Sequence, residues 1–423
     1  MTSPRVLTIC HGHPDFVPAG TELFAHQLHS SFAKNGLTES YLLACVTGLH
    51  RGMREGSALQ SLDGRSNEFL LRVGRFDPVM LCHAGDGEPI ASLGRLLTTL
   101  KPDIVHFHHL LHIGGESLAL IKRTLPQTRI VFTLHDFHPI CAREGLMLKS
   151  TANALCHVAT PDACHACLPD IAASRFALRR LHLGNMLNLV DSFVAPSSFV
   201  RDRFISWGIE ASRIIEIRNG VAASSVEDAM NTTAPASAAA FGYFGTVAPH
   251  KGALLALEAV TRLVDDVDAG LGIYGDVSFQ SGAFQDEFAK ALRRARGRAQ
   301  HHGPYQRADL TRLMSGVDWV VVPSLWWENA PLVILEAFRH RKPVIAADIG
   351  GMAELVQHGR NGLLFRRGDA GDLARAMSRA ATEEGLWSSL RDGIAPVATV
   401  TDVAAAHARL YAQLLEFDER RSA

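Results

Sequence analysis

The sequence predicts an α/β protein built from two doubly wound domains, each a parallel sheet wrapped by helices. The chain has 423 residues, which suits two cores of about 200 residues each. Strand-like runs followed by helical periodicity recur in the N-terminal half and again in the C-terminal half. This alternation is typical of parallel sheets, whose strands are joined by helices.

The first series of elements begins close to the N-terminus. Its expected members are a strand over Arg5 to Cys10, a helix over Glu22 to Lys34, a strand over Ile104 to Phe107, a helix over Ser117 to Arg123 and a strand over Ile130 to Leu134. The carboxyl ends of such strands all meet one edge of the sheet, where ligands bind.

A second series follows a stretch of Ala, Ser, Thr and Pro that cannot form a packed face. Its expected members are strands over Ala240 to Gly245, Leu271 to Tyr274, Trp319 to Val322 and Val344 to Ala347, with helices from about Lys251 to Val264 and Pro331 to His340. A last helix, about Asp402 to Phe417, has apolar positions at helical spacing and is expected to pack back on the N-terminal domain. We therefore expect an N-terminal domain over 1–225, a linker over 226–240, a C-terminal domain over 241–398 and a returning segment over 399–423.

Composition excludes several classes of protein. Apolar residues make up 47% and charged residues 20%, as in folded globular proteins. The formal net charge of −1 supplies no strong positive field for nucleic acid. The N-terminus lacks the pattern of a secretory signal, and no run approaches the roughly 20 apolar residues of a membrane span. We expect a cytoplasmic protein, with peripheral contact at the inner membrane face left open.

One segment, from Val317 to Phe365, carries the densest pattern of chemistry. An apolar strand over Trp319 to Val322 leads into a loop that contains Glu328 and Asn329. Pro331 suits the first helical position, where its missing N–H costs nothing, and the neighbouring amides and the helix dipole would receive a diphosphate. Because the loop follows a strand's carboxyl end, it is expected to face the ligand.

Two carboxylates flank that helix start. Glu328 precedes it and Glu336 follows about five residues, or 1.5 Å each, beyond Pro331. One would accept hydrogen bonds from sugar hydroxyls and the other from ribose hydroxyls. The alternative is that one is a solvated loop residue and the other an ordinary helix residue.

The whole pattern of Pro-Ser, an aromatic residue, Glu-Asn-x-Pro and a second Glu resembles the retaining glycosyltransferases of family four. The resemblance is strongest from Ala240 to about Ala376 and extends into the N-terminal half. It implies the GT-B architecture, in which two Rossmann-like, doubly wound domains face a cleft. It also implies transfer of a sugar from a nucleotide diphosphate to a hydroxyl acceptor, with the anomeric configuration retained.

The resemblance further implies a donor site. Lys251 resembles the family's phosphate-binding lysine and would neutralise the leaving diphosphate. Thr246 stands where the family often has Arg, and Ala19 replaces one glycine of the family's N-terminal loop. The complete set of expected donor-binding residues is Gly20, Gly245, Thr246, Lys251, Tyr305, Glu328, Asn329, Ala330, Pro331, Leu332 and Glu336.

Histidines gather after two strands of the first half. By resemblance, His135 lies beside the reacting sugar, so His135, Lys251 and Glu328 are the expected catalytic residues. His108 and His109 are assigned to the acceptor side. The alternative for this cluster is a set of partly buried polar residues or an adventitious metal patch, and for His106, inside its strand, we favour that alternative.

Four cysteines, Cys141, Cys156, Cys164 and Cys167, fall within 27 residues. The last two have the Cys-x-x-Cys spacing of tetrahedral zinc sites, with His138, His157 and His165 as substitute ligands. The alternative is a set of free or redox-active thiols. Such a zinc ion would organise the loop after His135 rather than take part in the transfer.

The expected function is sugar transfer in the biosynthesis of polysaccharide, lipopolysaccharide or another glycoconjugate. The partners are a nucleotide diphosphate sugar and a hydroxyl acceptor that is a glycan, a glycolipid or a small molecule. No metal ion or other cofactor is expected in catalysis, because cationic, amide and glycine-loop groups meet the phosphates. Two alternatives remain open: a nucleotide-sugar epimerase, since fold alone does not settle chemistry, and a non-catalytic nucleotide-sugar sensor.

Overall fold

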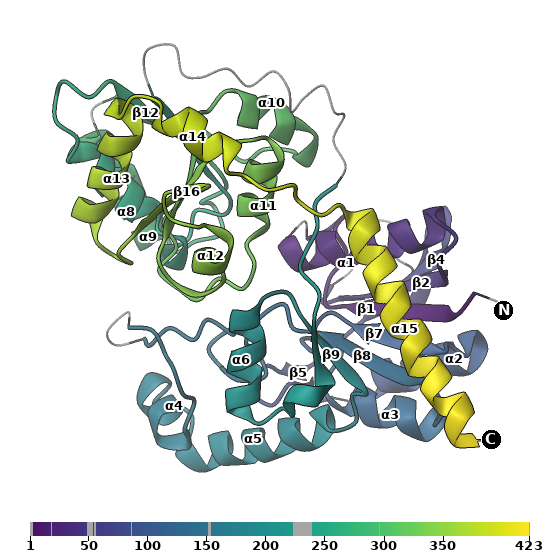
Figure 1. Cartoon of the computed structure of the whole chain (residues 1–423). Helices are drawn as coiled ribbons and strands as arrows, with labels where there is room; N and C mark the ends of the chain where they lie inside the picture. The colour runs from purple at the N-terminus through teal and green to yellow at the C-terminus, as the bar shows by residue number, and fades with distance from the viewer. Residues whose placement is uncertain are drawn as a thin grey trace. The chain divides into compact units, whose positions relative to one another are not determined.

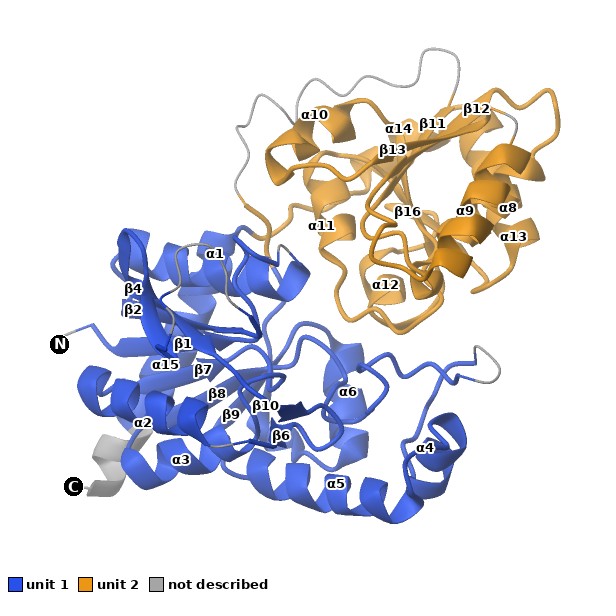
Figure 2. Cartoon of the chain, turned by 180° about the vertical axis from the view of Figure 1, so that it is seen from behind, with its two compact units in different colours: residues 1–219, 399–423 blue, residues 220–398 orange. Residues whose placement is uncertain are grey.

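The computed structural model describes residues 3–17, 19–48, 54, 56–85, 87–150, 154–222, 239–295 and 297–422. The chain divides into two compact units (Figure 2). Unit 1 comprises residues 1–219 and 399–423, and unit 2 comprises residues 220–398. The linker expected over 226–240 lies outside the described residues except for its last two. Each unit contains its own, mainly parallel, sheet, as the sequence predicted.

Unit 1 alternates strands and helices in the order expected for a doubly wound sheet (Figure 1). Its elements are β1 (Arg5–Cys10), α1 (Gly20–Lys34), β2 (Glu39–Val46), β3 (Leu59–Leu62), β4 (Arg65–Arg72), β5 (Phe76–Asp77), β6 (Cys82–His83), α2 (Glu88–Leu100), β7 (Ile104–Phe107), α3 (Glu116–Thr124), β8 (Arg129–Thr133), α4 (Pro161–Cys167), α5 (Ala173–Leu187), β9 (Ser192–Ala195), α6 (Ser198–Trp207), η1 (Ala211–Arg213), β10 (Ile214–Glu216) and α15 (Val400–Ser422).

The main sheet of unit 1 has eight strands in the order β10-β9-β8-β7-β1-β2-β4-β3. β3 pairs antiparallel with β4, and the other neighbours pair in parallel. The central strands β1, β7 and β8 are almost entirely buried, because helices cover both faces of a parallel sheet. β5 and β6 form a separate two-stranded sheet.

The C-terminal helix α15 belongs to unit 1, although it follows unit 2 in the sequence. It packs against α1, and Val403, Leu410 and Tyr411 join the core that includes Phe24 and Phe32. Figure 1 shows α15 in yellow beside α1 and the unit 1 strands. The predicted return of this helix to the N-terminal domain is confirmed, and the helix is longer than predicted at both ends.

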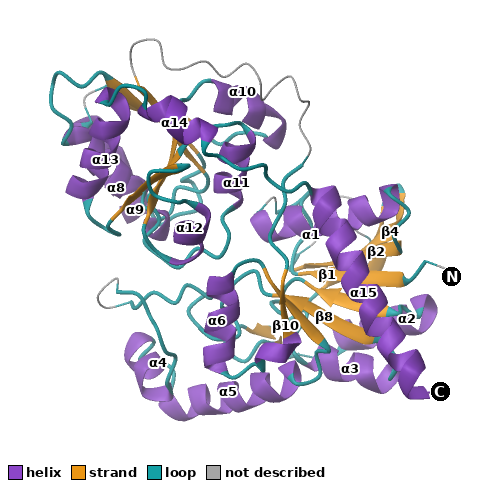
Figure 3. Ribbon diagram, viewed as in Figure 1, coloured by secondary structure: helices purple, strands orange, loops and turns teal. Residues whose placement is uncertain are grey.

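Unit 2 consists of β11 (Ala239–Phe244), η2 (Pro249–Lys251), α8 (Ala253–Thr261), β12 (Ala269–Tyr274), α9 (Gly282–Arg294), β13 (Ala299–Gly303), η3 (Arg307–Asp309), α10 (Leu310–Ser315), β14 (Trp319–Val322), α11 (Leu332–Arg339), β15 (Val344–Ala347), α12 (Gly350–Leu355), β16 (Gly362–Phe365), α13 (Ala370–Thr382) and α14 (Leu386–Asp392). Its six strands pair in parallel in the order β13-β12-β11-β14-β15-β16. Figure 3 shows these strands in orange with helices beside them.

Each main sheet has one point where its winding reverses. In unit 2 the chain proceeds from β11 to β13 on one side and from β14 to β16 on the other, so the reversal lies between β11 and β14. In unit 1 the corresponding neighbours are β1 and β7. Ligands of doubly wound sheets bind beyond the carboxyl ends of the strands at such reversals. Both places carry residues that the sequence singled out.

Candidate active site

The loop after β14 holds a carboxylate with several partners. Glu328 is buried, and its Oε1 atom accepts hydrogen bonds from Lys251 Nζ at 2.7 Å, Ser324 Oγ at 2.8 Å and Trp326 Nε1 at 2.8 Å. Burial alone would raise the pKa of Glu328, but the Lys251 charge and these hydrogen bonds lower it below its usual value. Glu328 is therefore held as an ionised carboxylate.

Lys251 reaches Glu328 from the loop after β11, across the sheet reversal. Its ammonium also lies 4.7 Å from the centre of the Trp326 ring, a cation–π distance. The sequence predicted a helix from about Lys251, whereas Pro249–Lys251 forms a short 3₁₀ turn and α8 begins at Ala253. Gly252 between them has a φ of 76°, which breaks the helical path.

Gly252 also allows the two loops to touch. A Cβ atom at this position would lie 1.9 Å from the carbonyl oxygen of Pro323, and the Leu325 N–H donates to the His250 carbonyl at 2.8 Å. A side chain at residue 252 would push the β14 loop away. The close approach of backbone to backbone therefore brings Lys251 to Glu328.

Gly351 supports the same loop from α12. Its N–H donates to the Glu328 carbonyl at 2.9 Å, and a Cβ atom there would lie 1.7 Å from the Asn329 carbonyl oxygen. Gly351 therefore fixes the position of the backbone that carries the Glu328 side chain.

The N-terminus of α11 follows this loop directly. Asn329 and Ala330 lead to Pro331, which occupies the N-cap position with φ −64° and ψ 120°, and the helix begins at Leu332. The prediction that Pro331 is the first helical residue is thus wrong by one position, because its ψ angle is extended. No side chain caps α11. Amides at an uncapped helix N-terminus, together with the helix dipole, form an anion site.

Glu336 lies one turn further along α11. It is buried, and Arg307 Nη2 lies 2.6 Å from its Oε1. Burial raises the pKa of Glu336, and the Arg307 charge offsets only part of this rise. Sequence reasoning missed Arg307, although it stands two residues after Tyr305 in a loop already assigned to the site.

The other predicted residues of unit 2 lie at the carboxyl ends of neighbouring strands. Gly245 follows β11 with a φ of 129° and donates its N–H to the Tyr274 carbonyl at 3.0 Å. Thr246 is exposed, and its carbonyl accepts from Tyr243 Oη at 2.8 Å. Tyr305, after β13, packs edge-on against Phe244, and burial raises its pKa to about 12.

In unit 1 the predicted histidines form a largely buried cluster. His108 Nδ1 lies 2.8 Å from His135 Nε2, so one of these rings donates to the other. Burial lowers the pKa of His135 to about 3, and that of His108 is also well below its usual value. His108 and His109 are at most 4% exposed, so the acceptor-side residues lie in the interior. His106, for which a partly buried polar residue or an adventitious metal patch was expected, is fully buried.

His109 has a defined tautomer. The Leu111 N–H donates to His109 Nδ1 at 2.7 Å, so the ring proton is on Nε2, which donates to Asp136 Oδ2 at 2.5 Å. Burial lowers the pKa of His109 to about 3. The neutral imidazole therefore orients an ionised carboxylate next to His135.

Gly20 is the first residue of α1 in unit 1. Ala19 occupies the N-cap position and no side chain caps the helix, so its first amides have the same character as those of α11. In the first turn Glu22, which is buried, lies 2.8 Å from His11 Nε2. Sequence reasoning did not find this ion pair, whose partners are eleven residues apart.

Four cysteines line one pocket after β8: Cys141, Cys156, Cys164 and Cys167. Among the described residues, two sets of three possible metal ligands have their ligand atoms within 4.8 Å of one another. One set is His13, His26 and Glu68, and the other is His109, Asp136 and His138. No three of the four thiols are that close. The structure gathers the predicted ligands around one cavity but with wider spacing than a bound ion requires.

Comparisons with known proteins identify the family. A model of "Glycosyltransferase Family 4" matches residues 18–225, and a model of "Glycosyl transferases group 1" matches residues 238–383. The chain belongs to glycosyltransferase family 4. Together the two matches cover most of both units, and they place β14, its loop and α11 within the second model.

Individual relatives of this glycosyltransferase are more distant. D-inositol 3-phosphate glycosyltransferase of Jonesia denitrificans is 32% identical over 158 residues, which cover 36% of this chain and 37% of that protein. The matched regions span less than two fifths of the length of the curated relatives.

Solved structures confirm the GT-B fold over nearly all of this chain. Sucrose-phosphate synthase from Thermosynechococcus elongatus matches with a TM-score of 0.69 and 17% identity, covering 97% of this chain and 99% of that one. Anabaena HepE in complex with UDP-glucose matches with a TM-score of 0.60 and 18% identity, covering 99% of both chains. Among the described residues, no helix is both long and apolar enough to cross a membrane.

Proposed function

We propose that this family 4 glycosyltransferase moves a sugar from a nucleotide diphosphate to a hydroxyl acceptor, with retention at the anomeric carbon. The observation that carries the proposal is the ionised Glu328, held by Lys251 across the β11–β14 reversal beside the uncapped start of α11. A carboxylate suits sugar hydroxyls, whereas an ammonium and helix amides suit phosphates. These groups are neighbours, as the sugar and the diphosphate of one donor are.

Each part of the donor has a proposed partner. Lys251, Gly245, Thr246 and the α11 amides after Asn329 would hold the diphosphate. Glu328 would accept hydrogen bonds from the sugar. Glu336 would accept from the ribose, with Tyr305 beside the nucleobase. Because Lys251 and Glu328 are 2.7 Å apart, the bond between sugar and diphosphate would lie where their contacts meet.

The proposed reaction breaks the bond between the anomeric carbon and the diphosphate oxygen. An acceptor hydroxyl then forms a bond to that carbon on the same face, and its proton passes to the departing diphosphate. Negative charge grows on the diphosphate as the bond breaks, so the Lys251 ammonium and the helix amides stabilise the transition state more than the bound donor. This scheme assigns no step to a metal ion.

A solved structure with the same fold supports a nucleotide-sugar donor. The Anabaena HepE structure, which shares the fold, holds UDP-glucose, and matched relatives include several named glycosyltransferases. The resemblance to the family assigns His135 of unit 1 to the reacting sugar and His108 and His109 to the acceptor side. A glycan, a glycolipid or a small molecule with a free hydroxyl would serve as the acceptor.

Three variants test the donor site. Lys251→Ala should lower turnover most, by about a hundredfold, because it removes a charge that acts mainly on the leaving group. Glu336→Gln should weaken free UDP and UDP-glucose alike by about tenfold, since ribose contacts change little during transfer. Glu328→Gln should lower transfer by about tenfold and spare UDP affinity. Calorimetry with UDP and initial rates with UDP-, ADP- and GDP-sugars in EDTA provide the measurements.

Lys290→Ala, on the exposed face of α9, is the matched control and should behave like the parent. Parental UDP affinity and transfer in all three site variants would overturn the donor assignment. An epimerised nucleotide sugar formed without an acceptor would replace transfer by epimerisation. Donor binding with no turnover on a broad acceptor panel would identify a sensor. Loss of activity in EDTA that magnesium restores would contradict the metal-free scheme.

A further inference from the structure

The segment between β8 and α5 contains a stretch that apolar packing does not explain. Its first part is anchored by buried side chains, including Phe137, Ile140 and Leu148. From Ala154 to Ala172 every residue is described and none is buried, and α4 lies within this stretch. A helix of seven residues with no buried side chain is not stable on its own. Small segments without a core usually depend on a disulfide or a metal ion.

Four thiols surround a single pocket in this segment. They come from three separate pieces of backbone: Cys141 from the turn after Phe137, Cys156 from the strand-like pairing with Met147, and Cys164 and Cys167 from α4. The Cys156 N–H donates to the Met147 carbonyl at 2.7 Å, which fixes Cys156 beside the first part. Cys164 and Cys167 are three residues apart, so they share one face of the helix.

One of the four thiols, that of Cys167, accepts a hydrogen bond from the backbone. The Ser150 N–H donates to Cys167 Sγ at 3.3 Å, and Ser150 Oγ donates to the Cys167 carbonyl at 2.6 Å. Hydrogen bonds from surrounding groups orient the ligands of metal sites. None of the seven cysteines, all of which are described, forms a disulfide. His138, His157 and His165 do not line the pocket, so they are weaker ligand candidates than the cysteines.

We propose that Cys141, Cys156, Cys164 and Cys167 bind one structural zinc ion, which fastens α4 to the rest of unit 1. Tetrahedral zinc with bonds of about 2.3 Å places its sulfur atoms roughly 3.8 Å apart. No three thiols lie within 4.8 Å of one another, so binding draws the walls of the pocket inward. The ion replaces the thiol protons: Zn²⁺ and four thiols give a zinc tetrathiolate and four released protons.

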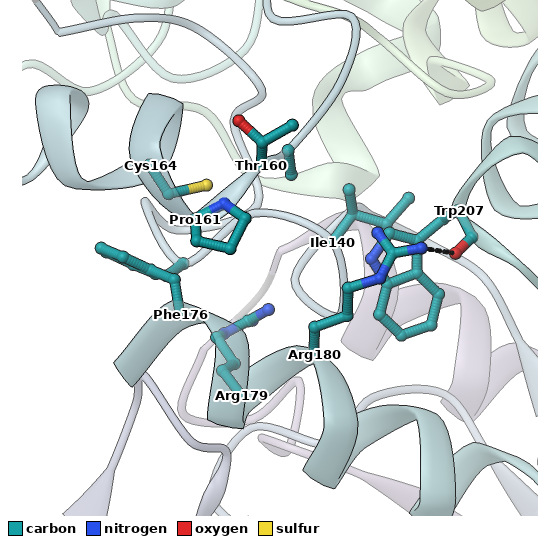
Figure 4. A pocket seen from close by; sticks show the side chains of 10 residues that line it. Ile140, Thr160, Pro161, Cys164, Phe176, Arg179, Arg180 and Trp207 are labelled. Carbon is teal, nitrogen blue, oxygen red and sulfur yellow. Dashed lines mark hydrogen bonds between the residues drawn. The ribbon is translucent and has the colours of Figure 1, made fainter. Parts of the chain in front are cut away.

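The surroundings suit the negative charge of that centre. A zinc ion with four thiolates carries a net charge of −2, and Lys149 lines the same pocket. The buried guanidinium of Arg179 lines the adjoining pocket, which Cys164 and Phe176 also border (Figure 4). In that view Arg180 is hydrogen-bonded to the Trp207 carbonyl, at 3.0 Å, on the other side of the pocket.

The proposed zinc lies close in sequence to the histidine cluster. Cys141 follows His138 by three residues, and His138 Nδ1 lies 3.2 Å from Asp136 Oδ1. Arg179 also donates to the carbonyls of His138 and Pro139. The proposed ion therefore fastens the loop that follows Asp136.

Metal analysis of tag-free protein tests the proposal. The parent should contain about one zinc per chain by elemental mass spectrometry, and Cys164→Ser and Cys167→Ser should lose at least about four fifths of it. Cys82→Ser is the matched control, since Cys82 is outside the cluster, and should keep its zinc. His26→Ala should also keep it, which separates this site from the His13, His26 and Glu68 group.

Measurements on the parent protein alone test the proposal even if the cysteine variants fail to fold. A mercurial reagent should release the zinc with about four equivalents, and cobalt reconstitution should give the intense absorption of a tetrahedral thiolate site. Zinc-free parent with four thiols titratable by Ellman's reagent, or with these cysteines in disulfides by mass spectrometry, would overturn the proposal. Full zinc in Cys164→Ser would do the same.

Discussion

Both units have a reversal in the strand order of a parallel sheet, but different kinds of side chain lie near it in each unit. In unit 1 the loops after β1, β7 and β8 gather imidazoles: the His11 and His109 rings are 4.2 Å apart, and His108 bonds to His135. In unit 2 the loops after β11 and β14 gather an ammonium and a carboxylate, Lys251 and Glu328. The fold sets the position of each site, whereas the side chains set its chemistry.

This difference ties the two units to pH in different ways. Burial lowers the pKa of many unit 1 histidines, which stay neutral in the folded protein: His29, His106, His108, His109, His112, His135 and His407. In unit 2 the pKa of Glu328 is lowered, so that carboxylate remains ionised in mild acid. Acid should therefore destabilise unit 1 more than unit 2.

The largest expected effect is the loss of unit 1 stability below pH 6.5. Unfolded histidine has a pKa of about 6.5, whereas His109 and His135 have folded values of about 3 and His407 of about 4. The unfolded chain then binds protons that the folded unit does not. The stabilisation that each such histidine contributes is fully present above pH 6.5. It falls by about 1.4 kcal/mol per pH unit as the pH drops toward the pKa of that histidine in the folded protein. Hydrogen exchange from pH 7.5 to 5 should show unit 1 losing protection first.

A single substitution can calibrate this slope. His407 is buried, its Nδ1 donates to the Val403 carbonyl, and its Nε2 has no hydrogen-bond partner. His407→Leu should make the free energy of unfolding less steep with pH by about one proton. The pH dependence of stability that His11 contributes has the opposite sign. The Cys10 and Glu22 hydrogen bonds raise its pKa to about 10 against the effect of burial, so the stability that it contributes is lost as the pH rises toward that value. Loss of protection in unit 2 at the same pH as unit 1 would contradict the comparison.

The architecture was readable from the sequence because it depends on strong patterns. β14 is a continuous apolar run and β1 and β7 are mostly apolar, as buried parallel strands require. Element ends were less predictable, because backbone angles decide them. Gly252, with its φ of 76°, separates Lys251 from α8, and Pro331 takes the N-cap instead of the first helical position.

The residues of the site were also readable, but their partners were not. Glu328 and Lys251 were named for separate parts of a donor, yet the structure joins them directly, 77 residues apart in the chain. Arg307 beside Glu336 was not predicted, since neither spacing nor composition indicates which loops meet. The interior position of His108 and His109 likewise depends on packing that a strand-end rule does not describe.

The next effect tests how unit 2 holds its ion pair. Gly252→Ala should destabilise unit 2 by about 3 kcal/mol, because a Cβ atom would lie 1.9 Å from the Pro323 carbonyl oxygen and the residue has a φ of 76°. Urea unfolding followed by tryptophan fluorescence reports mainly on unit 2, which contains Trp319, Trp326, Trp327 and Trp387. Gly270→Ala, where a Cβ atom meets nothing within 4 Å, should change little. Equal midpoints for the two variants would show that the close contact is not required.

The smallest effect concerns the hydrogen bond between the C-terminal helix α15 and strand β7 of unit 1. Tyr411 Oη lies 2.6 Å from His106 Nδ1, and His106 Nε2 lies 2.7 Å from Thr133 Oγ1, so the fully buried imidazole has a partner on each side. Tyr411→Phe leaves Nδ1 unpaired in an apolar core, which should cost unit 1 about 2 kcal/mol. Tyr243→Phe is the counterpart in unit 2, where the lost partner is the backbone carbonyl of Thr246. Hydrogen exchange in urea should show Tyr411→Phe lowering protection of β7 and α15 while unit 2 keeps its parental values, and Tyr243→Phe should do the reverse. If Tyr411→Phe leaves α15 and β7 as protected as in the parent, the apolar contacts of Val403 and Leu410 are enough to return the helix to unit 1, and the hydrogen bond is incidental to it.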